Sequence, residues 1–193
     1  MFTNINETPT GYRGNKHLLK NRRVLTIEIV GTIFIIFLGT ALHFTYALSG
    51  NNPFVGSFSA VNESVWEHLK LPFWPSLLWM LIEMYPLRKA CGNFFAAKAT
   101  GAVMMVVLIP VAFYSYTAFT EEILAVDIAT FMIAVIIGQI VSFKLFKRGI
   151  QSKSTEMAAI FVFALLAMLF IAFTFYPPHF PIFRDSNTGG YGI

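Results

Sequence analysis

The stretch VLTIEIVGTIFIIFLGTALHFTYAL, residues 24–48, decides the fold class. It contains one carboxylate, Glu28, and exceeds the roughly 20 apolar residues that a helix needs to cross about 30 Å of hydrocarbon. Three similar stretches and one shorter stretch occur elsewhere in the chain, at 94–113, 123–143, 157–175 and 73–87. The sequence therefore predicts an all-α fold, a polytopic bundle with five transmembrane spans.

Composition and charge distribution support the same class. Apolar residues make up 56% of the chain and charged residues 12%, whereas about a quarter of an average soluble domain is charged. With five spans and an inner N-terminus, every lysine and arginine except Lys70 and Arg184 falls on the inner side. We therefore expect the N-terminus inside and the C-terminus outside, in the plasma membrane of a bacterial cell. The net charge of +4 then reflects membrane orientation and contact with anionic membrane lipids, and indicates no nucleic-acid partner.

The chain divides into three predicted segments: a cytoplasmic tail at 1–23, the transmembrane domain at 24–175 and a Pro/Gly-rich extracytoplasmic tail at 176–193. Between the first two spans, 62–70 is expected to form a short helix at the membrane interface, with Asn62 as its cap and Trp66 at the headgroup level. Pro72 disfavours helix in the residue before it, so a break is expected at Leu71.

Most of the polar chemistry is predicted at the outer end. At about 1.5 Å per residue, His43 lies roughly 28 Å from the start of its span. We expect His43, Glu67 and His179 to hold a divalent transition metal such as zinc, because imidazole and carboxylate are ligands that suit it. Glu63 would be the catalytic residue that transfers protons. The remaining residues of this expected ligand pocket are Asn62, His68, Arg184 and Asp185.

A purely structural interpretation of the same residues remains open. Glu63, Glu67 and Lys70 have the spacing of a solvated ion-pair stripe on one helix face. His68 would then bond to a backbone carbonyl, and the chain lacks the HExxH pattern of many zinc enzymes. For the tail, the alternative is a rigid plug over the bundle.

Two further acids lie within the spans. Glu28 and Glu83 are each about 6 Å inside the inner boundary, at a similar depth to Gln139. Ionisable groups at membrane depth are costly, so these two acids are candidates for a proton-accepting pair. The alternative is that they reach toward nearby basic residues, Arg23, Arg88 and Lys89.

Two long segments, NESVWEHLKLPFWPSLLW and FYPPHFPIFRDSNTGGYGI, resemble an uncharacterised family of small bacterial integral membrane proteins, known as a domain of unknown function. The resemblance covers the chain from the first span onward. It implies a multi-span bundle with its signature residues on one face, and it implies no activity or cofactor. The matching positions are Asn62, Glu63, Trp66, Glu67, His68, Pro177, Pro178, His179, Arg184 and Asp185.

The leading functional hypothesis is an outward-facing pocket of histidine, acidic and arginine side chains that binds a metal ion or small polar ligand, with hydrolysis as its expected chemistry. One alternative is a small transporter or proton-coupled carrier that uses Glu28 and Glu83. Another is a non-catalytic membrane protein that binds a partner through its outer aromatic residues. The sequence leaves open which of these holds, whether the protein is an enzyme, and whether it forms a homo-oligomer.

Overall fold

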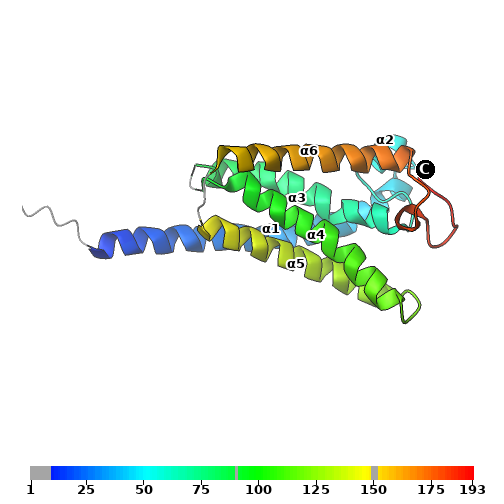
Figure 1. Cartoon of the computed structure of the whole chain (residues 1–193), viewed down its shortest axis with the longest axis horizontal. Helices are drawn as coiled ribbons and strands as arrows, with labels where there is room; N and C mark the ends of the chain where they lie inside the picture. The colour runs from blue at the N-terminus through cyan, green and yellow to red at the C-terminus, as the bar shows by residue number, and fades with distance from the viewer. Residues whose placement is uncertain (1–9, 90, 149–151) are drawn as a thin grey trace, which may run out of the picture.

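The computed structural model describes residues 10–89, 91–148 and 152–193, with side chains from residue 21 onward. Its described elements are α1 (Thr10–Leu48), α2 (Pro53–Gly56), α3 (Val65–Leu87), α4 (Phe94–Thr117), α5 (Leu124–Arg148), α6 (Lys153–Phe175) and the 3-10 helix η1 (Pro181–Phe183). The five long helices lie lengthwise in one bundle and alternate in direction along the chain (Figure 1). Because these described residues form helices and no strand, the all-α prediction is confirmed.

Four of the described helices are long and apolar enough to cross a membrane: Asn21–Leu48 of α1, α4, α5 and α6. Large apolar side chains are exposed along them, among them Phe37 at 73% and Phe161 at 66%. A water-soluble monomer rarely exposes so much apolar surface to water, whereas apolar side chains that face lipid tails carry no free-energy cost. These features are compatible with a membrane protein. The count of five spans and the orientation stay predictions.

Helix α3 differs from the sequence-based expectation. A separate interfacial helix at 62–70, a break at Leu71 and a short span at 73–87 are replaced by one continuous helix, Val65–Leu87. The N-cap is Ser64 and not Asn62, because the Ser64 hydroxyl accepts a hydrogen bond from the Glu67 N–H at 3.3 Å. The helix packs against α1, α4 and α6. Its first half, from Glu67 to Ser76, is mostly buried, whereas Leu81 and Tyr85 in its second half are exposed.

Proline residues are accommodated in α3 by contacts with its neighbours. Pro75 has no N–H to donate to the carbonyl of Leu71, so this carbonyl loses its helical partner. Gly39 of α1 lies directly against it, since a Cβ added at Gly39 would be 2.6 Å from the Leu71 oxygen. One residue further on, the Ser76 hydroxyl donates to the Pro72 carbonyl at 2.6 Å. Helix α3 thus stays continuous through its prolines, with Gly39 of α1 packed closely against the carbonyl that Pro75 leaves without a helical partner.

Aromatic side chains fill the space between α3 and α6. The Phe73 and Phe170 rings lie 4.9 Å apart by their centroids, and Trp66 lies 4.9 Å from Phe170 and 4.8 Å from Phe183. Trp66 therefore packs inside an aromatic cluster, and its expected position at the headgroup level stays a prediction. On the other side of the bundle, a Cβ at Gly101 of α4 would be 2.7 Å from the Gly138 carbonyl of α5, so these two helices also meet backbone to backbone.

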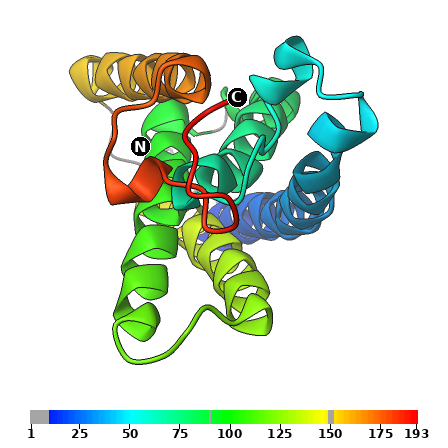
Figure 2. The ribbon, with the colours of Figure 1, turned by 90° about the vertical axis from the view of Figure 1, so that its right-hand side faces the viewer.

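The two terminal segments are more ordered than a polar composition suggests. Helix α1 already begins at Thr10, within the segment expected to be a tail, while residues 1–9 lie outside the described part. The C-terminal segment folds back over one end of the bundle (Figure 2). There the Ile193 N–H donates to the Thr174 carbonyl at 3.2 Å, and the Asn62 side chain donates to the Gly192 carbonyl at 3.0 Å. The tail is thereby bonded to both α6 and the segment before α3.

Candidate functional site

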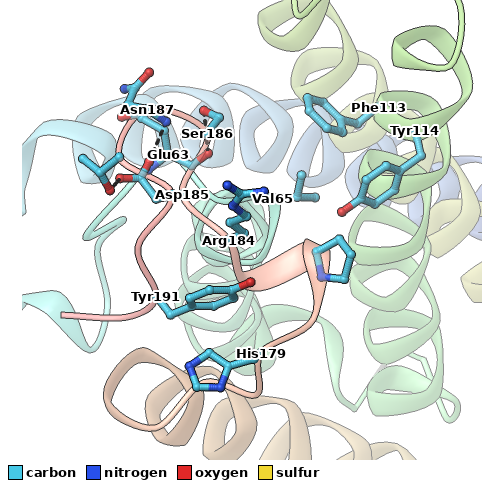
Figure 3. A pocket seen from close by; sticks show the side chains of 13 residues that line it. Glu63, Val65, Phe113, Tyr114, His179, Arg184, Asp185, Ser186, Asn187 and Tyr191 are labelled. Carbon is cyan, nitrogen blue, oxygen red and sulfur yellow. Dashed lines mark hydrogen bonds between the residues drawn. The ribbon is translucent and has the colours of Figure 1, made fainter.

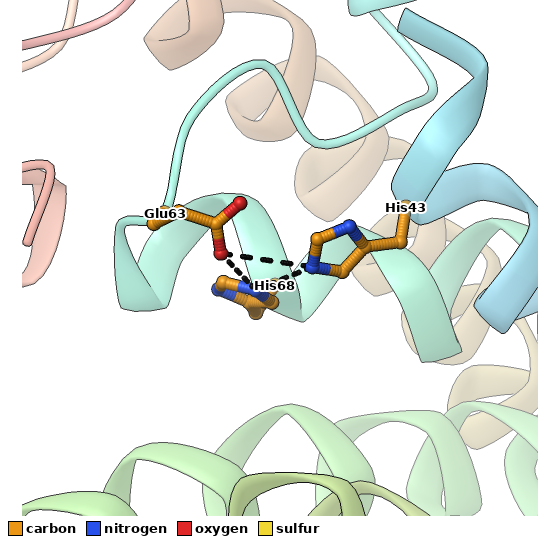
Figure 4. A group of neighbouring side chains, drawn as sticks. All are labelled: His43, Glu63 and His68. Atoms are coloured by element: carbon orange, nitrogen blue, oxygen red, sulfur yellow. Dashed lines mark hydrogen bonds and ion pairs between the residues drawn. The ribbon is translucent and has the colours of Figure 1, made fainter. Parts of the chain in front are cut away.

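Three polar side chains meet at the end of the bundle that the tail covers. They are His43 near the end of α1, Glu63 just before α3, and His68 in the first turns of α3 (Figure 4). Glu63 Oε2 lies 3.6 Å from His43 Nε2 and 3.3 Å from His68 Nε2. The two Nε2 atoms lie 3.2 Å apart. One potential ligand atom from each residue therefore points into the same small space.

The spacing of these atoms matches that of metal ligands. In a tetrahedral zinc site each donor lies about 2.0–2.1 Å from the ion, so any two donors lie about 3.3–3.4 Å apart. The three separations here bracket that value, and all three ligand atoms lie within 4.8 Å of one another. Two histidines and one carboxylate also form a ligand set that zinc uses in catalytic sites. The residues present therefore fit a divalent transition metal.

A hydrogen bond orients one of the histidine rings. His68 Nδ1 lies 2.9 Å from the Ser64 carbonyl, which can only accept, so Nδ1 carries the proton. In the neutral imidazole this leaves the lone pair on Nε2, the atom that faces His43 and Glu63. A backbone carbonyl that fixes the tautomer in this way is the usual outer-shell partner of a metal-bound histidine. Ser64 thus both caps α3 and presets His68.

Electrostatics at the cluster favour an ionised carboxylate. Hydrogen bonds donated by His43 and, in its doubly protonated form, by His68 hold the pKa of Glu63 well below its usual range. Nearby, burial raises the pKa of Glu122 in the loop between α4 and α5, and the charge of Asp127 raises it further, while His68 lowers it. The side chains remain partly accessible, with 29% exposed for each histidine and 39% for Glu63. A cation can therefore reach this negative site from solvent.

Glu67, one of the three expected metal ligands, lies elsewhere. It forms a buried ion pair with Lys70, one turn along α3. Its carboxylate also accepts from the Val61 N–H at 3.0 Å, and Lys70 donates to the Gly56 carbonyl and the Thr174 hydroxyl, each at 2.8 Å. The expected ion pair of Glu67 and Lys70 is formed, but it is enclosed by the fold and not solvated. Glu63 does not lie on the same helix face as Glu67 and Lys70, because α3 begins two residues after Glu63.

His179, the other expected ligand, lies in the tail. Its ring packs edge-on against Tyr191, with 4.6 Å between centroids. Both line a cavity of about 630 Å³, into which Arg184 also projects and whose wall includes Tyr114 and Glu63 (Figure 3). The expected grouping of His43, Glu67 and His179 is therefore not brought together. Of those three, only His43 contributes to the cluster of His43, Glu63 and His68.

Asp185 and Asn62 organise the backbone around the cluster. Asp185 Oδ1 accepts from the Glu63 N–H and the Asn187 N–H, each at 3.2 Å, and Thr188 donates to the other oxygen. Burial raises the pKa of Asp185, but these hydrogen bonds outweigh it and lower the pKa overall. Asn62 Oδ1 accepts from the Ser64 N–H at 3.0 Å. Both residues thus hold the turn that carries Glu63, and neither lies among the candidate ligands.

The acids Glu28 and Glu83 meet at the opposite end of the bundle. Both are buried, and their partner is Lys98 of α4, not the expected Arg23, Arg88 or Lys89. Sequence reasoning counted Lys98 among the basic residues of the inner boundary. Lys98 lies four residues into an apolar helix, level with two acids on other helices. This position could have indicated that Lys98 is the buried partner of those acids.

A family model described as "Family of unknown function (DUF6512)" matches residues 16–193, so the chain belongs to that family. No curated protein and no solved structure matches the chain. The matched residues include His43, Glu63, His68 and the tail, and extend over nearly the whole described bundle. It agrees with the resemblance to a domain of unknown function noted from the two long segments.

Proposed function

We propose that this protein is a metal-binding membrane protein whose His43, Glu63 and His68 hold a divalent transition metal ion such as zinc. The observation that carries the proposal is the mutual spacing of the three ligand atoms, 3.2, 3.3 and 3.6 Å, which is that of donors around one tetrahedral ion. The preset tautomer of His68 and the ionised state of Glu63 support it.

Three protein ligands leave one tetrahedral position for water or a substrate, which is the arrangement of catalytic zinc sites. A metal in such a site lowers the pKa of its bound water and makes it a nucleophile near neutral pH. Glu63 also lines the 630 Å³ cavity that holds Arg184, so an anionic group bound by this arginine would lie beside the cluster. The proposed chemistry is therefore hydrolysis of a small anionic substrate.

The proposed location is the outer face of the membrane. Helix α3 joins the end of α1 to the start of α4, and these lie at opposite ends of the bundle (Figure 1). If the four apolar helices cross the membrane, α3 must return across it as well, which gives five crossings. The positive-inside distribution then puts the N-terminus inside and the cluster outside.

Elemental analysis of the detergent-purified protein tests the proposal. We expect about one equivalent of zinc or a related metal in the wild type, as a single closed set of three ligands implies. The variants His43→Ala and His68→Ala should lose it. His179→Ala is the matched control, because it removes an exposed histidine from the same end of the molecule but from outside the cluster.

The outcome decides between metal binding and a hydrogen-bonded network. Wild-type protein that holds no metal after zinc is resupplied, with monodisperse behaviour retained, overturns the proposal. Equal loss of metal in the His179→Ala control would place the ligands elsewhere and overturn the assignment to His43 and His68. Glu67 also lies outside the cluster. A folded Glu67→Gln variant should therefore bind as much metal as the wild type.

A further inference from the structure

A second group of charges is enclosed between four helices, far from the metal-ligand cluster. Lys98 Nζ lies 2.8 Å from Glu28 Oε1 and 2.5 Å from Glu83 Oε1. The three residues come from α4, α1 and α3, and their exposed fractions are 5%, 3% and 1%. One lysine therefore serves two carboxyl groups where solvent does not reach.

Among the residues whose side chains are described, the surroundings add polarity but no further charge. Helix α5 contributes Ser142, which donates to Glu28 Oε1 at 3.2 Å, and Gln139, whose amide lies 3.3 Å from the Glu28 main-chain carbonyl. The Phe146 ring lies 5.5 Å from Lys98 Nζ. The charged groups that face this cluster are thus Glu28 from α1, Glu83 from α3 and Lys98 from α4, with uncharged partners from α5.

The hydrogen-bond pattern of the two carboxyl groups is incomplete. Glu28 Oε2 and Glu83 Oε2 are buried and accept no hydrogen bond from the described residues. Buried polar groups are normally paired, because a lost hydrogen bond is not replaced by water there. These two oxygens are therefore positions at which a proton can reside.

Charge balance indicates which ligand this cluster takes. Two carboxylates and one ammonium leave a net charge of −1 in a region of low dielectric, where an uncompensated charge is strongly disfavoured. One added proton makes the group neutral and converts a carboxylate into a carboxyl group that can donate. We propose that Glu28, Glu83 and Lys98 form a buried proton-binding site that holds one exchangeable proton on one of its two carboxyl groups.

This function is independent of the metal-ligand cluster and gives the bundle a second ligand at its other end. The proton adds to a carboxylate oxygen and comes from water, so the step changes the charge of the site from −1 to zero. Because the site joins α1, α3 and α4 and bonds to α5, loss of the proton weakens the contact between four helices. Proton binding and helix packing are thus linked here.

Infrared spectroscopy of the purified full-length protein tests the proposal. At neutral pH the wild type should show the carbonyl stretch of a protonated carboxyl group, which should vanish when the pH is raised. Glu83→Gln should lack the band, because Lys98 then matches the single remaining carboxylate; Glu28→Gln should behave alike. The matched control is Glu121→Gln, which changes an exposed glutamate in a loop and should leave the band intact.

A wild type without this band from about pH 5 to about pH 9, a range in which ordinary carboxyl groups with pKa values near 4 are largely ionised, overturns the proposal. So does a band of equal size in both glutamine variants. Stabilisation by sodium ions in place of a protonated carboxyl would assign the site to a metal cation and also overturn it. If Glu83→Gln fails to fold, Glu28→Gln and the wild-type titration give the answer.

Discussion

At the scale of single residues, Glu63 shows how a small shift of a helix start changes a site. If α3 began at Asn62, Glu63 and Glu67 would share a stripe on one face. The helix begins at Val65, so Glu63 lies in the preceding turn and points to His43 and His68. The sequence indicated that His43, Glu63 and His68 lie at one end of the bundle, but it did not indicate that these three side chains meet. Helix ends depend on local capping bonds that pattern alone does not resolve.

Zinc binding should weaken as the pH falls from about 7.5 to about 5.5. Glu63 stays ionised over this range because His43 and His68 lower its pKa, so its carboxylate contributes no change. The histidines must be neutral to bind metal, so protons compete with the ion more strongly as the pH falls. Affinity should fall by up to about tenfold per pH unit for each histidine that is protonated. Competition with a chromophoric chelator measures this; a flat profile would argue against histidine ligands.

At the scale of helices, α3 was the hardest element to predict from its sequence. Pro72 indicated a break, and the charged residues near its start indicated an interfacial segment. Both indications are local, whereas the features that keep α3 continuous lie on other parts of the chain: Gly39 beside the Leu71 carbonyl and Thr174 beside Lys70. The four strongly apolar stretches could be predicted without knowledge of their neighbours, because length and hydropathy alone define them.

The substitution Gly39→Ala should destabilise the bundle by about 1–3 kcal/mol, the usual cost of forcing extra volume into a packed contact. The new Cβ would lie 2.6 Å from the Leu71 carbonyl oxygen, so α1 and α3 must move apart. Thermal unfolding in detergent, followed by tryptophan fluorescence, measures the change. Thr40→Ala, the exposed neighbour, is the control and should unfold close to the wild type. Equal behaviour of the two variants would contradict the backbone contact.

At the scale of the whole molecule, the alternating direction of five long helices separates two polar regions. The metal-ligand cluster lies at the end covered by the tail, and the proton-binding site lies toward the other end (Figure 1). The sequence predicted this separation by position along the spans. It could not predict Lys98 as the shared partner, because that depends on how α1, α3 and α4 are rotated about their axes.

Cysteine labelling tests the predicted orientation. In a Cys91→Ala background, Asn187→Cys in the tail should react with a membrane-impermeant maleimide in intact cells. Ser154→Cys, at the start of α6 and also exposed, should react only after permeabilisation. We expect this labelling pattern because the basic residues set the orientation, with their side of the bundle inside the cell. The reverse labelling pattern would invert the topology, and labelling of both sites in intact cells would rule out a crossing by α6.

The buried charges of α3 also constrain how the protein is made. A ribosome delivers α3 to the membrane before α4 and α6 exist, so Glu83 then lacks Lys98, and Lys70 lacks Thr174. Glu67 and Lys70 find each other as partners within α3 itself, one turn apart. Each unpaired charge at membrane depth opposes transfer into lipid. If α3 crosses the membrane as proposed, we therefore expect its stable insertion to depend on helices that are translated later.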